Sequence, residues 1–226
     1  MMQIISKALG MLAVMLPFGG GASCNSSSDV VALPDPAVDA PLAGAKGRET
    51  IVVAGGCFWG IQAVFERLKG VERALSGYSG GAANTATYEK VCSGRTGHAE
   101  AVEVIFDPSQ ISVGQVLKVF FSVAHDPTQL NRQGPDQGTQ YRSAIFYTSE
   151  EQKKIVDAYV KQLDATKVFS QPIVTQIVPL EAFYPAEDYH QGYMDLHPEN
   201  MYIVINDYPK VENLRKYYPS MFVEKK

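Results

Sequence analysis

Apolar residues in the first half of the chain change from a strand-like run to a helix-like period around one cysteine. Residues 50–54 are a β-branched apolar run, which is typical of a strand buried on both faces. Gly55 and Gly56 end this run, and from Cys57 onward apolar residues recur every three or four positions until Gly70. That period predicts a helix. Cys57 therefore lies at a predicted strand–turn–helix junction.

Strand-like and helix-like patterns continue to alternate along the rest of the chain. Residues 99–106 alternate as a strand, which places Glu100 on the same face as Val102 and Val104. The glycine-rich residues 77–97 and the polar residues 125–140 are predicted loops, and no element is predicted after Leu180. The other predicted elements are a helix over 113–124, a strand over 141–147, a helix over 149–163 opened by a Ser149–Gln152 capping box, and a strand over 172–178. This order predicts an α/β (α+β) domain, a mixed β-sheet with helices packed on it.

The N-terminal residues have the composition of a targeting segment. Lys7 is the only charge in residues 1–23, and the apolar run 8–18 is shorter than the ~20 residues that span a membrane. We predict a signal peptide over 1–23 and export to the bacterial periplasm or to a membrane surface facing it. Because Cys24 comes directly after the cleavage site, two interpretations stay open: acylation of Cys24, which would attach the mature chain to a membrane, and plain secretion.

Residues 24–48 differ in composition from the rest of the chain. They are rich in Ser, Pro and Ala, lack any helical or alternating period, and contain few large apolar residues. Such a segment buries too little surface to order itself, so we predict a flexible tether. The function should then belong to a single domain over residues 49–222.

Composition narrows the classes of function. The chain has 226 residues, 46% of them hydrophobic, which is enough for one sizeable core. Lys plus Arg number 20 and Asp plus Glu 24, a net charge of −4, so no basic excess indicates nucleic-acid binding. Three cysteines exclude a disulfide-dense scaffold. Four scattered histidines, His190 and His197 among them, do not make a recognisable ligand set, so we predict no metal site.

Cys57 is the first candidate for chemistry. A free cysteine has a pKa of about 8.5, and the N–H groups at a helix start favour the thiolate, so we expect this helix to lower the pKa of Cys57. Phe58 and Trp59 come next in the chain and indicate an apolar pocket for a small hydrophobic group. The alternative is a buried, inert cysteine, which is the commoner case among proteins in general. The glycine-flanked position at a strand–helix turn favours the reactive interpretation.

The hexapeptide Gly55-Gly56-Cys57-Phe58-Trp59-Gly60 resembles the signature of the methionine sulfoxide reductase A family. Further segments resemble that family in order and spacing, and they extend over much of the predicted domain: residues 88–94, 96–100, 125–127, 136–143 and 184–191. The resemblance implies a ferredoxin-like plait at the core of the mixed sheet. It also implies reduction of methionine S-sulfoxide, free or in proteins, and hence repair of oxidised proteins, without a metal or a bound organic cofactor.

By this resemblance Cys57 is the catalytic nucleophile and Glu100 the catalytic acid. The sulfoxide oxygen leaves poorly unless it is protonated, so an acid must lie beside the nucleophile. Burial of Glu100 on its strand face would raise its pKa and keep it protonated near neutrality. The substrate-binding residues that the resemblance implies are Phe58 and Trp59 as walls of a methyl pocket, Tyr88 and Tyr141 as hydroxyl donors, and Asp136 as a second polar contributor. Without the family resemblance, the two tyrosines would be interpreted as core residues and Asp136 as a turn residue.

In one respect the sequence departs from the common family pattern. Many members carry resolving cysteines in a C-terminal tail, but no cysteine occurs after Cys92 here. Cys92 lies in a motif whose cysteine is not generally the resolving one, and we interpret it as a structural thiol. We therefore expect an external reductant: a thioredoxin-like or glutaredoxin-like protein, or a small thiol.

Two other functions fit parts of the sequence. A cysteine hydrolase would pair Cys57 with a histidine base, for which His98, His125 and His190 are the candidates. A non-catalytic binding module on a tether would leave Cys57 without a chemical role. The hydrolase requires a histidine beside the thiol, whereas the reductase requires an acid.

Overall fold

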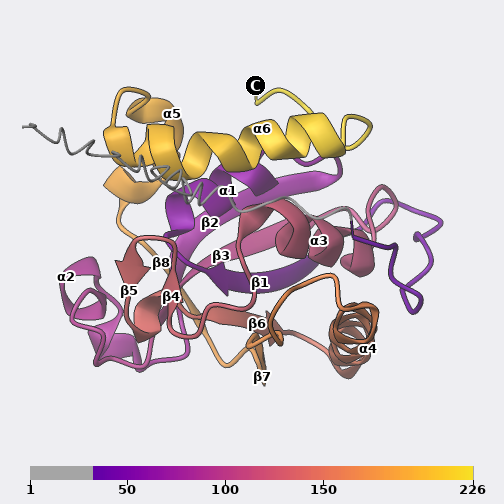
Figure 1. The fold of residues 1–226 in the computed structure, drawn as a ribbon, viewed down its shortest axis with the longest axis horizontal. Helices are drawn as coiled ribbons and strands as arrows, with labels where there is room; N and C mark the ends of the chain where they lie inside the picture. The colour runs from indigo at the N-terminus through magenta and orange to yellow at the C-terminus, as the bar shows by residue number, and fades with distance from the viewer. Residues whose placement is uncertain (1–32, 226) are drawn as a thin grey trace, which may run out of the picture.

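A six-stranded mixed sheet forms the centre of the protein, whose computed structural model describes residues 33–225 (Figure 1). The strands lie in the order β7-β6-β1-β3-β2-β8. Their bounds are β1 Glu49–Gly55, β2 Val71–Ser79, β3 Ala99–Phe106, β6 Ser143–Tyr147, β7 Gln176–Pro179 and β8 Phe183–Pro185. A separate two-stranded sheet pairs β4 (Arg132–Gln133) with β5 (Asp136–Gln137).

The four central strands confirm the predicted ferredoxin-like plait. β1 runs antiparallel to β3 and β6, and β3 runs antiparallel to β2. Helix α1 (Phe58–Phe65) connects β1 to β2, and α3 (Val113–Val119), which continues as a π-helical turn over Phe120–Ala124, lies between β3 and β6. Strand β7 pairs parallel to β6, which makes the sheet mixed as predicted.

Strand β2 is the central strand that the sequence pattern missed. Its C-terminal half is buried, but apart from Tyr78 the buried positions are occupied by small residues and serines, and part of it falls in the predicted loop 77–97. The serine hydroxyls are satisfied inside the protein: Ser76 donates to Gln62 Oε1 at 2.8 Å and Ser79 to the Ala182 carbonyl at 2.8 Å. Tertiary hydrogen bonds therefore replace the apolar alternation that would have marked the strand.

The elements that were predicted agree with the pattern except at their ends. Short elements also occur inside the predicted loops (Tyr88–Val91, β4 and β5), and β8 and the C-terminal helices lie after Leu180, where no element was predicted. Helix α4 spans Glu150–Thr166, and Ser149 accepts the Gln152 N–H as predicted, although Gln152 itself accepts the N–H of Thr148. Strand β6 begins only at Ser143 because Thr139–Tyr141 form a 3₁₀ turn, and β7 begins only at Gln176.

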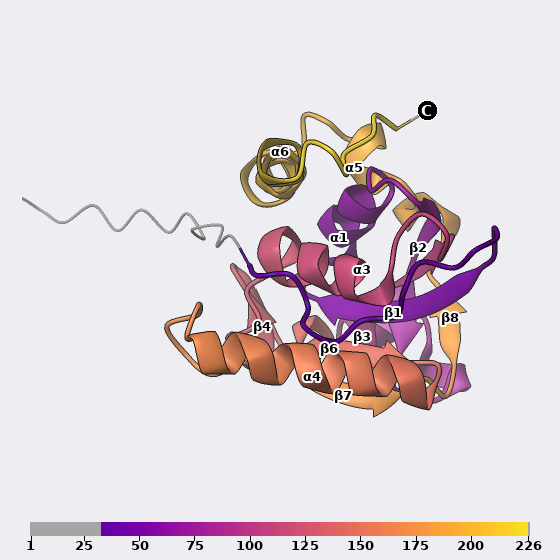
Figure 2. The ribbon, with the colours of Figure 1, turned by 90° about the vertical axis from the view of Figure 1, so that its right-hand side faces the viewer.

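The main core lies between one face of the sheet and the helices. Figure 2 shows α1, α3 and α6 (Tyr208–Tyr217) on the same side of the sheet. Helix α4 packs beside α3 along the β6–β7 edge and shares this core. A smaller apolar cluster covers the opposite face: Val52, Ala54, Ala99, Ala101, Ala144 and Phe146.

The sheet is curled. β7 and β8 are its opposite edges, yet only residues 180–182 separate them along the chain. A flat sheet would set these edges about 24 Å apart, at ~4.8 Å for each neighbouring pair, and so short a link could not span that distance. The link crosses the smaller cluster, where Leu180 and Phe183 pack.

The described part of the predicted flexible tether is packed on the domain, so that prediction is wrong for residues 33–48. Leu33 is buried, and the Pro34 carbonyl accepts the Tyr159 hydroxyl of α4 at 2.9 Å. Asp39 Oδ1 accepts the N–H of Gly114 in α3 at 2.9 Å. Tertiary hydrogen bonds thus order a segment that has no period of its own. The predicted signal peptide and Cys24 lie outside the described residues.

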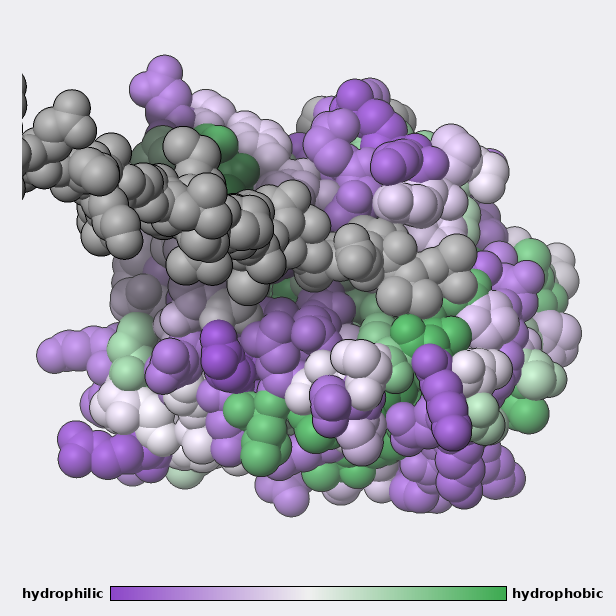
Figure 3. Space-filling model, viewed as in Figure 1, coloured by the Kyte–Doolittle hydropathy of each residue, from purple (hydrophilic) through white to green (hydrophobic). Residues whose placement is uncertain are grey.

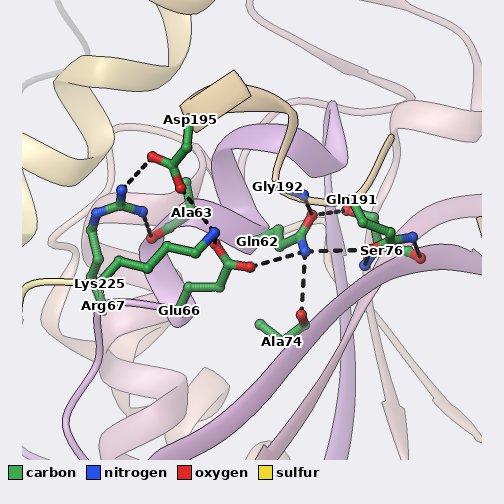
Figure 4. Close-up of polar contacts among 10 residues, drawn as sticks. All are labelled: Gln62, Ala63, Glu66, Arg67, Ala74, Ser76, Gln191, Gly192, Asp195 and Lys225. Atoms are coloured by element: carbon green, nitrogen blue, oxygen red, sulfur yellow. Dashed lines mark hydrogen bonds and ion pairs between the residues drawn. The ribbon is translucent and has the colours of Figure 1, made fainter. Parts of the chain in front are cut away.

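The C-terminal residues fold back onto α1 through two polar clusters (Figure 4). The Gln62 side chain bonds Ser76 on β2 and accepts the N–H of Gly192, just before α5 (Tyr193–Leu196). Lys225 lies 2.6 Å from Glu66 Oε2 and 2.8 Å from Asp195 Oδ2. These bonds hold the end of the described chain along α1.

Within residues 33–225, no helix is both long and apolar enough to span a bilayer. On the face drawn in Figure 3, hydrophilic side chains cover most of the surface and the apolar ones occur in smaller groups between them.

Candidate active site

One cavity brings together every residue that the sequence predicted for the site. Its volume is about 310 Å³. Its lining residues are Cys57, Phe58, Trp59, Tyr88, Glu100, Asp136, Tyr141, Asn200 and Tyr202. Asn200 and Tyr202 were not predicted. They come from the segment after Leu180, to which no element was assigned, and its many tyrosines were the only sequence signal for them.

Backbone geometry at the end of β1 places Cys57 at the cavity. Gly56 adopts φ +101°, and a β-carbon there would come within 2.5 Å of Gln133, so the turn requires glycine. Cys57 comes next as the N-cap residue of α1 and is 7% exposed. The predicted strand–turn–helix junction is therefore confirmed.

The ionisation of Cys57 differs from the sequence-based expectation. Burial, and after it the negative charges of Glu100 and Asp207, raises the pKa of the thiol well above its ordinary value. A backbone hydrogen bond from Trp59 at the helix start and the charge of Lys210 act in the opposite direction and are smaller. The expectation of a lowered pKa was wrong because desolvation and nearby carboxylates outweigh the helix N-terminus.

Glu100 reaches the start of the same helix from β3. Its side chain is buried, and its Oε2 accepts the Phe58 N–H at 3.2 Å. Burial is the main reason that its pKa rises to about 8, with the charges of Asp136 and Asp207 adding to it. At pH 7 the carboxyl group is therefore mostly protonated, which is the direction that the strand pattern predicted.

Aromatic rings form one side of the cavity. Trp59 stacks on Tyr193 with ring centroids 3.8 Å apart, and its indole N–H donates to His190 Nδ1 at 3.1 Å. Tyr202 meets Trp59 edge-on at 6.0 Å. These contacts hold the indole ring in one orientation and leave it and Phe58 as apolar surfaces beside Cys57.

Hydroxyl groups supply polar contacts in the cavity. Burial raises the pKa of Tyr88 and of Tyr141, so both phenols stay protonated and can donate hydrogen bonds at neutral pH. Tyr202 donates its hydroxyl to Asp136 Oδ2. Asp136 belongs to β5, and Tyr141 to the 3₁₀ turn just before β6. The short β4–β5 sheet thus brings to the cavity an acid that the sequence placed in a loop.

No histidine of the described chain lines the cavity, which argues against the hydrolase. His98 is engaged at both ring nitrogens, by the Gly81 N–H and the Ala82 carbonyl. His125 is engaged by the Phe120 carbonyl and the Ser143 hydroxyl, and burial lowers its pKa to about 4. His190 accepts from Trp59 and packs behind it. Over residues 33–225 no group of three or more side chains is arranged to hold a metal ion.

Comparison with known proteins identifies the family. The sequence matches the family model described as peptide methionine sulfoxide reductase over residues 49–221. It is 56% identical over 181 residues to peptide methionine sulfoxide reductase MsrA 2 of Mesorhizobium japonicum, covering 80% of this chain and 93% of that protein. The chain belongs to the MsrA family.

Other members of the MsrA family agree in sequence and in fold. An MsrA 2 protein of Synechocystis is 51% identical over 82% of this chain and 88% of its own length. The structure of methionine sulfoxide reductase A of Corynebacterium diphtheriae matches with a TM-score of 0.58 at 38% identity, covering 75% of this chain and 84% of that one. The reduced form of Mxr1 from Saccharomyces cerevisiae matches with a TM-score of 0.61 at 32% identity, covering 72% and 92%.

Proposed function

We propose that this protein, a methionine sulfoxide reductase that repairs oxidised proteins, acts through a sulfenic acid on Cys57 with Glu100 as the acid. The observation that carries the proposal is the junction at the start of α1. There the thiol of the N-cap residue and a largely protonated carboxyl group, which is hydrogen-bonded to the next residue, line one small cavity. The reaction requires a nucleophile that attacks the sulfoxide sulfur and a proton donor that protonates the oxygen bonded to it.

The proposed chemistry balances in atoms and electrons. The Cys57 sulfur attacks the sulfoxide sulfur, and Glu100 gives its proton to the oxygen. The hydroxyl group then transfers to the Cys57 sulfur: a new S–O bond forms there, and the S–O bond of the substrate and the transient bond between the two sulfurs break. Methionine departs, and Cys57 remains as a sulfenic acid. The methionine sulfur is reduced by two electrons and the cysteine sulfur is oxidised by two. The proton lost from the thiol returns to Glu100, so no net proton is consumed.

The cavity wall accounts for substrate choice in this proposal. Trp59 and Phe58 contact the methyl group of the substrate, and the Tyr88 and Tyr141 hydroxyls donate to the sulfoxide oxygen. Asp136 holds the Tyr202 hydroxyl in place. Because a chiral sulfoxide must present oxygen to one side and methyl to the other, this arrangement accepts one epimer, which we propose to be the S form.

A thiol must then reduce the sulfenic acid. Two equivalents of thiol convert it to the Cys57 thiol, a disulfide and water. We propose that the donor is external, a thioredoxin-like or glutaredoxin-like protein or a small thiol, since no cysteine occurs after Cys92 in the sequence. Cys92 itself is exposed at the C-terminal end of α2 (Tyr88–Val91). Export through residues 1–23, with or without acylation of Cys24, is part of the same proposal; the mass of the mature N-terminal peptide tests it.

A reductant-free single turnover tests the mechanism. One equivalent of methionine per enzyme should form from the S epimer and none from the R epimer, and mass spectrometry should find one added oxygen on the Cys57 peptide. Cys57→Ser should keep the fold and lose the burst, whereas Cys92→Ser should keep it. A Cys57–Cys92 disulfide in the product would refute external reduction, and a burst in Cys57→Ser would refute the nucleophile.

A further inference from the structure

A buried charge pair lies against the first turn of α1, and neither of its members lines the cavity. Asp207 is completely buried and its Oδ1 lies 3.0 Å from Lys210 Nζ, whose side chain is 15% exposed. Burying two charges together costs desolvation energy, and a surface pair would avoid this cost. The position of the pair therefore calls for an explanation.

Asp207 does not use its side chain within its own helix. It ends the π-helical turn Ile203–Asp207, which runs directly into α6, and its side chain accepts no N–H at the start of α6. Instead, Oδ1 lies so close to Gly60 that a β-carbon there would meet it at 2.1 Å. Its Oδ2 has no hydrogen-bond partner within residues 33–225. The carboxylate is thus directed at another helix, and one of its oxygens remains unsatisfied.

Gly60 links this carboxylate to the nucleophile. Cys57 is the N-cap residue of α1 and Gly60 lies three residues later, so both are at the same side of the first turn. The first turn of α1 contains no acidic residue of its own. The N-terminus of α1 favours a negative charge, and this includes the Cys57 thiolate. Asp207 brings a second negative charge to the same helix start, so the carboxylate and the thiolate compete for the same stabilisation.

We propose that Asp207 and Lys210 are positioning residues whose opposed charges set how readily the Cys57 thiol ionises. After burial and Glu100, Asp207 is the next cause that raises the pKa of Cys57, and Lys210 lowers it. Burial and Glu100 favour the protonated thiol, and the two charges of the pair shift this balance in opposite directions. A change in either charge moves the balance in a direction that Coulomb's law fixes. The proposal rests on the assignment of Cys57 as the nucleophile.

The other ionisable groups around Cys57 are accounted for. Glu100 faces it from β3, and Asp136 on β5 lines the same cavity. His125 packs on Gly55 behind the turn, and its pKa of about 4 leaves it neutral at pH 7. The hydroxyl groups in the cavity wall are those of Tyr88, Tyr141 and Tyr202. Lys210 is the cation that acts on the Cys57 thiol from among the described residues.

The test measures Cys57 alkylation by iodoacetamide in the full-length protein from pH 6 to 10, with the Cys57 peptide quantified by mass spectrometry. Asp207→Asn removes the negative charge at nearly constant shape, and we expect about threefold to tenfold faster alkylation at pH 7. Lys210→Met should move the profile to higher pH, and the double variant should return toward the wild type. Lys210→Arg, which keeps the positive charge, should preserve the wild-type profile. Lys216→Met, which loses an exposed charge on the same helix, should also leave the profile unchanged.

Opposite shifts in the two single variants would support the proposal. A merely structural pair would predict lower melting temperatures for both variants and alkylation profiles that shift in the same direction or not at all, and either result would overturn it. Because alkylation needs no sulfoxide, the outcome is distinguishable from a failure of the reductase mechanism. If Cys57 were not the nucleophile, Cys57→Ser would still reduce sulfoxide while these profiles shifted normally.

Discussion

Replacing Glu100 by Gln should increase the stability of the fold and slow the first chemical step. The buried carboxyl group has a folded-state pKa of about 8, whereas in the unfolded chain it titrates near 4.3. Between these values the folded protein binds a proton that the unfolded chain has released, so stability falls as pH rises through this window. At pH 7 this proton linkage lowers the free energy of unfolding by about 4 kcal/mol relative to acid pH. A neutral amide of the same shape removes this cost, so Glu100→Gln should be more stable than wild type by that order at pH 7.

The same substitution should slow the first chemical step. Proton transfer by a positioned acid is worth roughly 100-fold to 10,000-fold, and glutamine cannot supply the proton. The assay measures methionine release in a single turnover at pH 7 together with urea unfolding at pH 4 and pH 8. Glu103→Gln on the same strand is the control, because Glu103 is not in the cavity. A full-rate Glu100→Gln variant, or a stability gain that is the same at pH 4 and pH 8, would refute the reasoning.

Individual contacts support three further predictions. Trp59→Leu loses the stack on Tyr193 and should raise KM for methionine sulfoxide about tenfold with a smaller effect on kcat; an unchanged KM would contradict the pocket assignment. Burial lowers the pKa of His125 to about 4, so about 3 kcal/mol of stability present at pH 7 should be lost as pH falls from about 6.5 to 4; in His125→Gln, denaturant titrations at these pH values should lack that loss. Asp39→Ala removes the acceptor for the Gly114 N–H and should cost about 1 kcal/mol of unfolding free energy without changing single-turnover rate, whereas no loss would mean that residues 33–48 do not stabilise the domain.

Local sequence chemistry determined the elements whose pattern is independent of distant neighbours. The run before Gly55 and the period after Cys57 were sufficient to predict β1, α1 and the junction between them, because burial on both faces and helical periodicity each leave a mark within a few residues. The alternation around Glu100 likewise predicted which face of β3 the carboxyl group would occupy. The other predicted cavity residues, Tyr88, Asp136 and Tyr141, came from the resemblance of the motifs to the family in order and spacing.

Tertiary structure decided what depends on groups far apart in the chain. Strand β2 and residues 33–48 are ordered by hydrogen bonds to partners that no local window contains. The C-terminal segment closes the cavity with Asn200 and Tyr202, and it carries the charges of Asp207 and Lys210 to the start of α1. A helix N-terminus inferred from sequence predicts a reactive thiolate, but the pKa of Cys57 is set by desolvation and by the sum of charges around it. Those quantities exist only once the chain has folded, because burial and distance, unlike periodicity, are not properties of a short stretch of sequence.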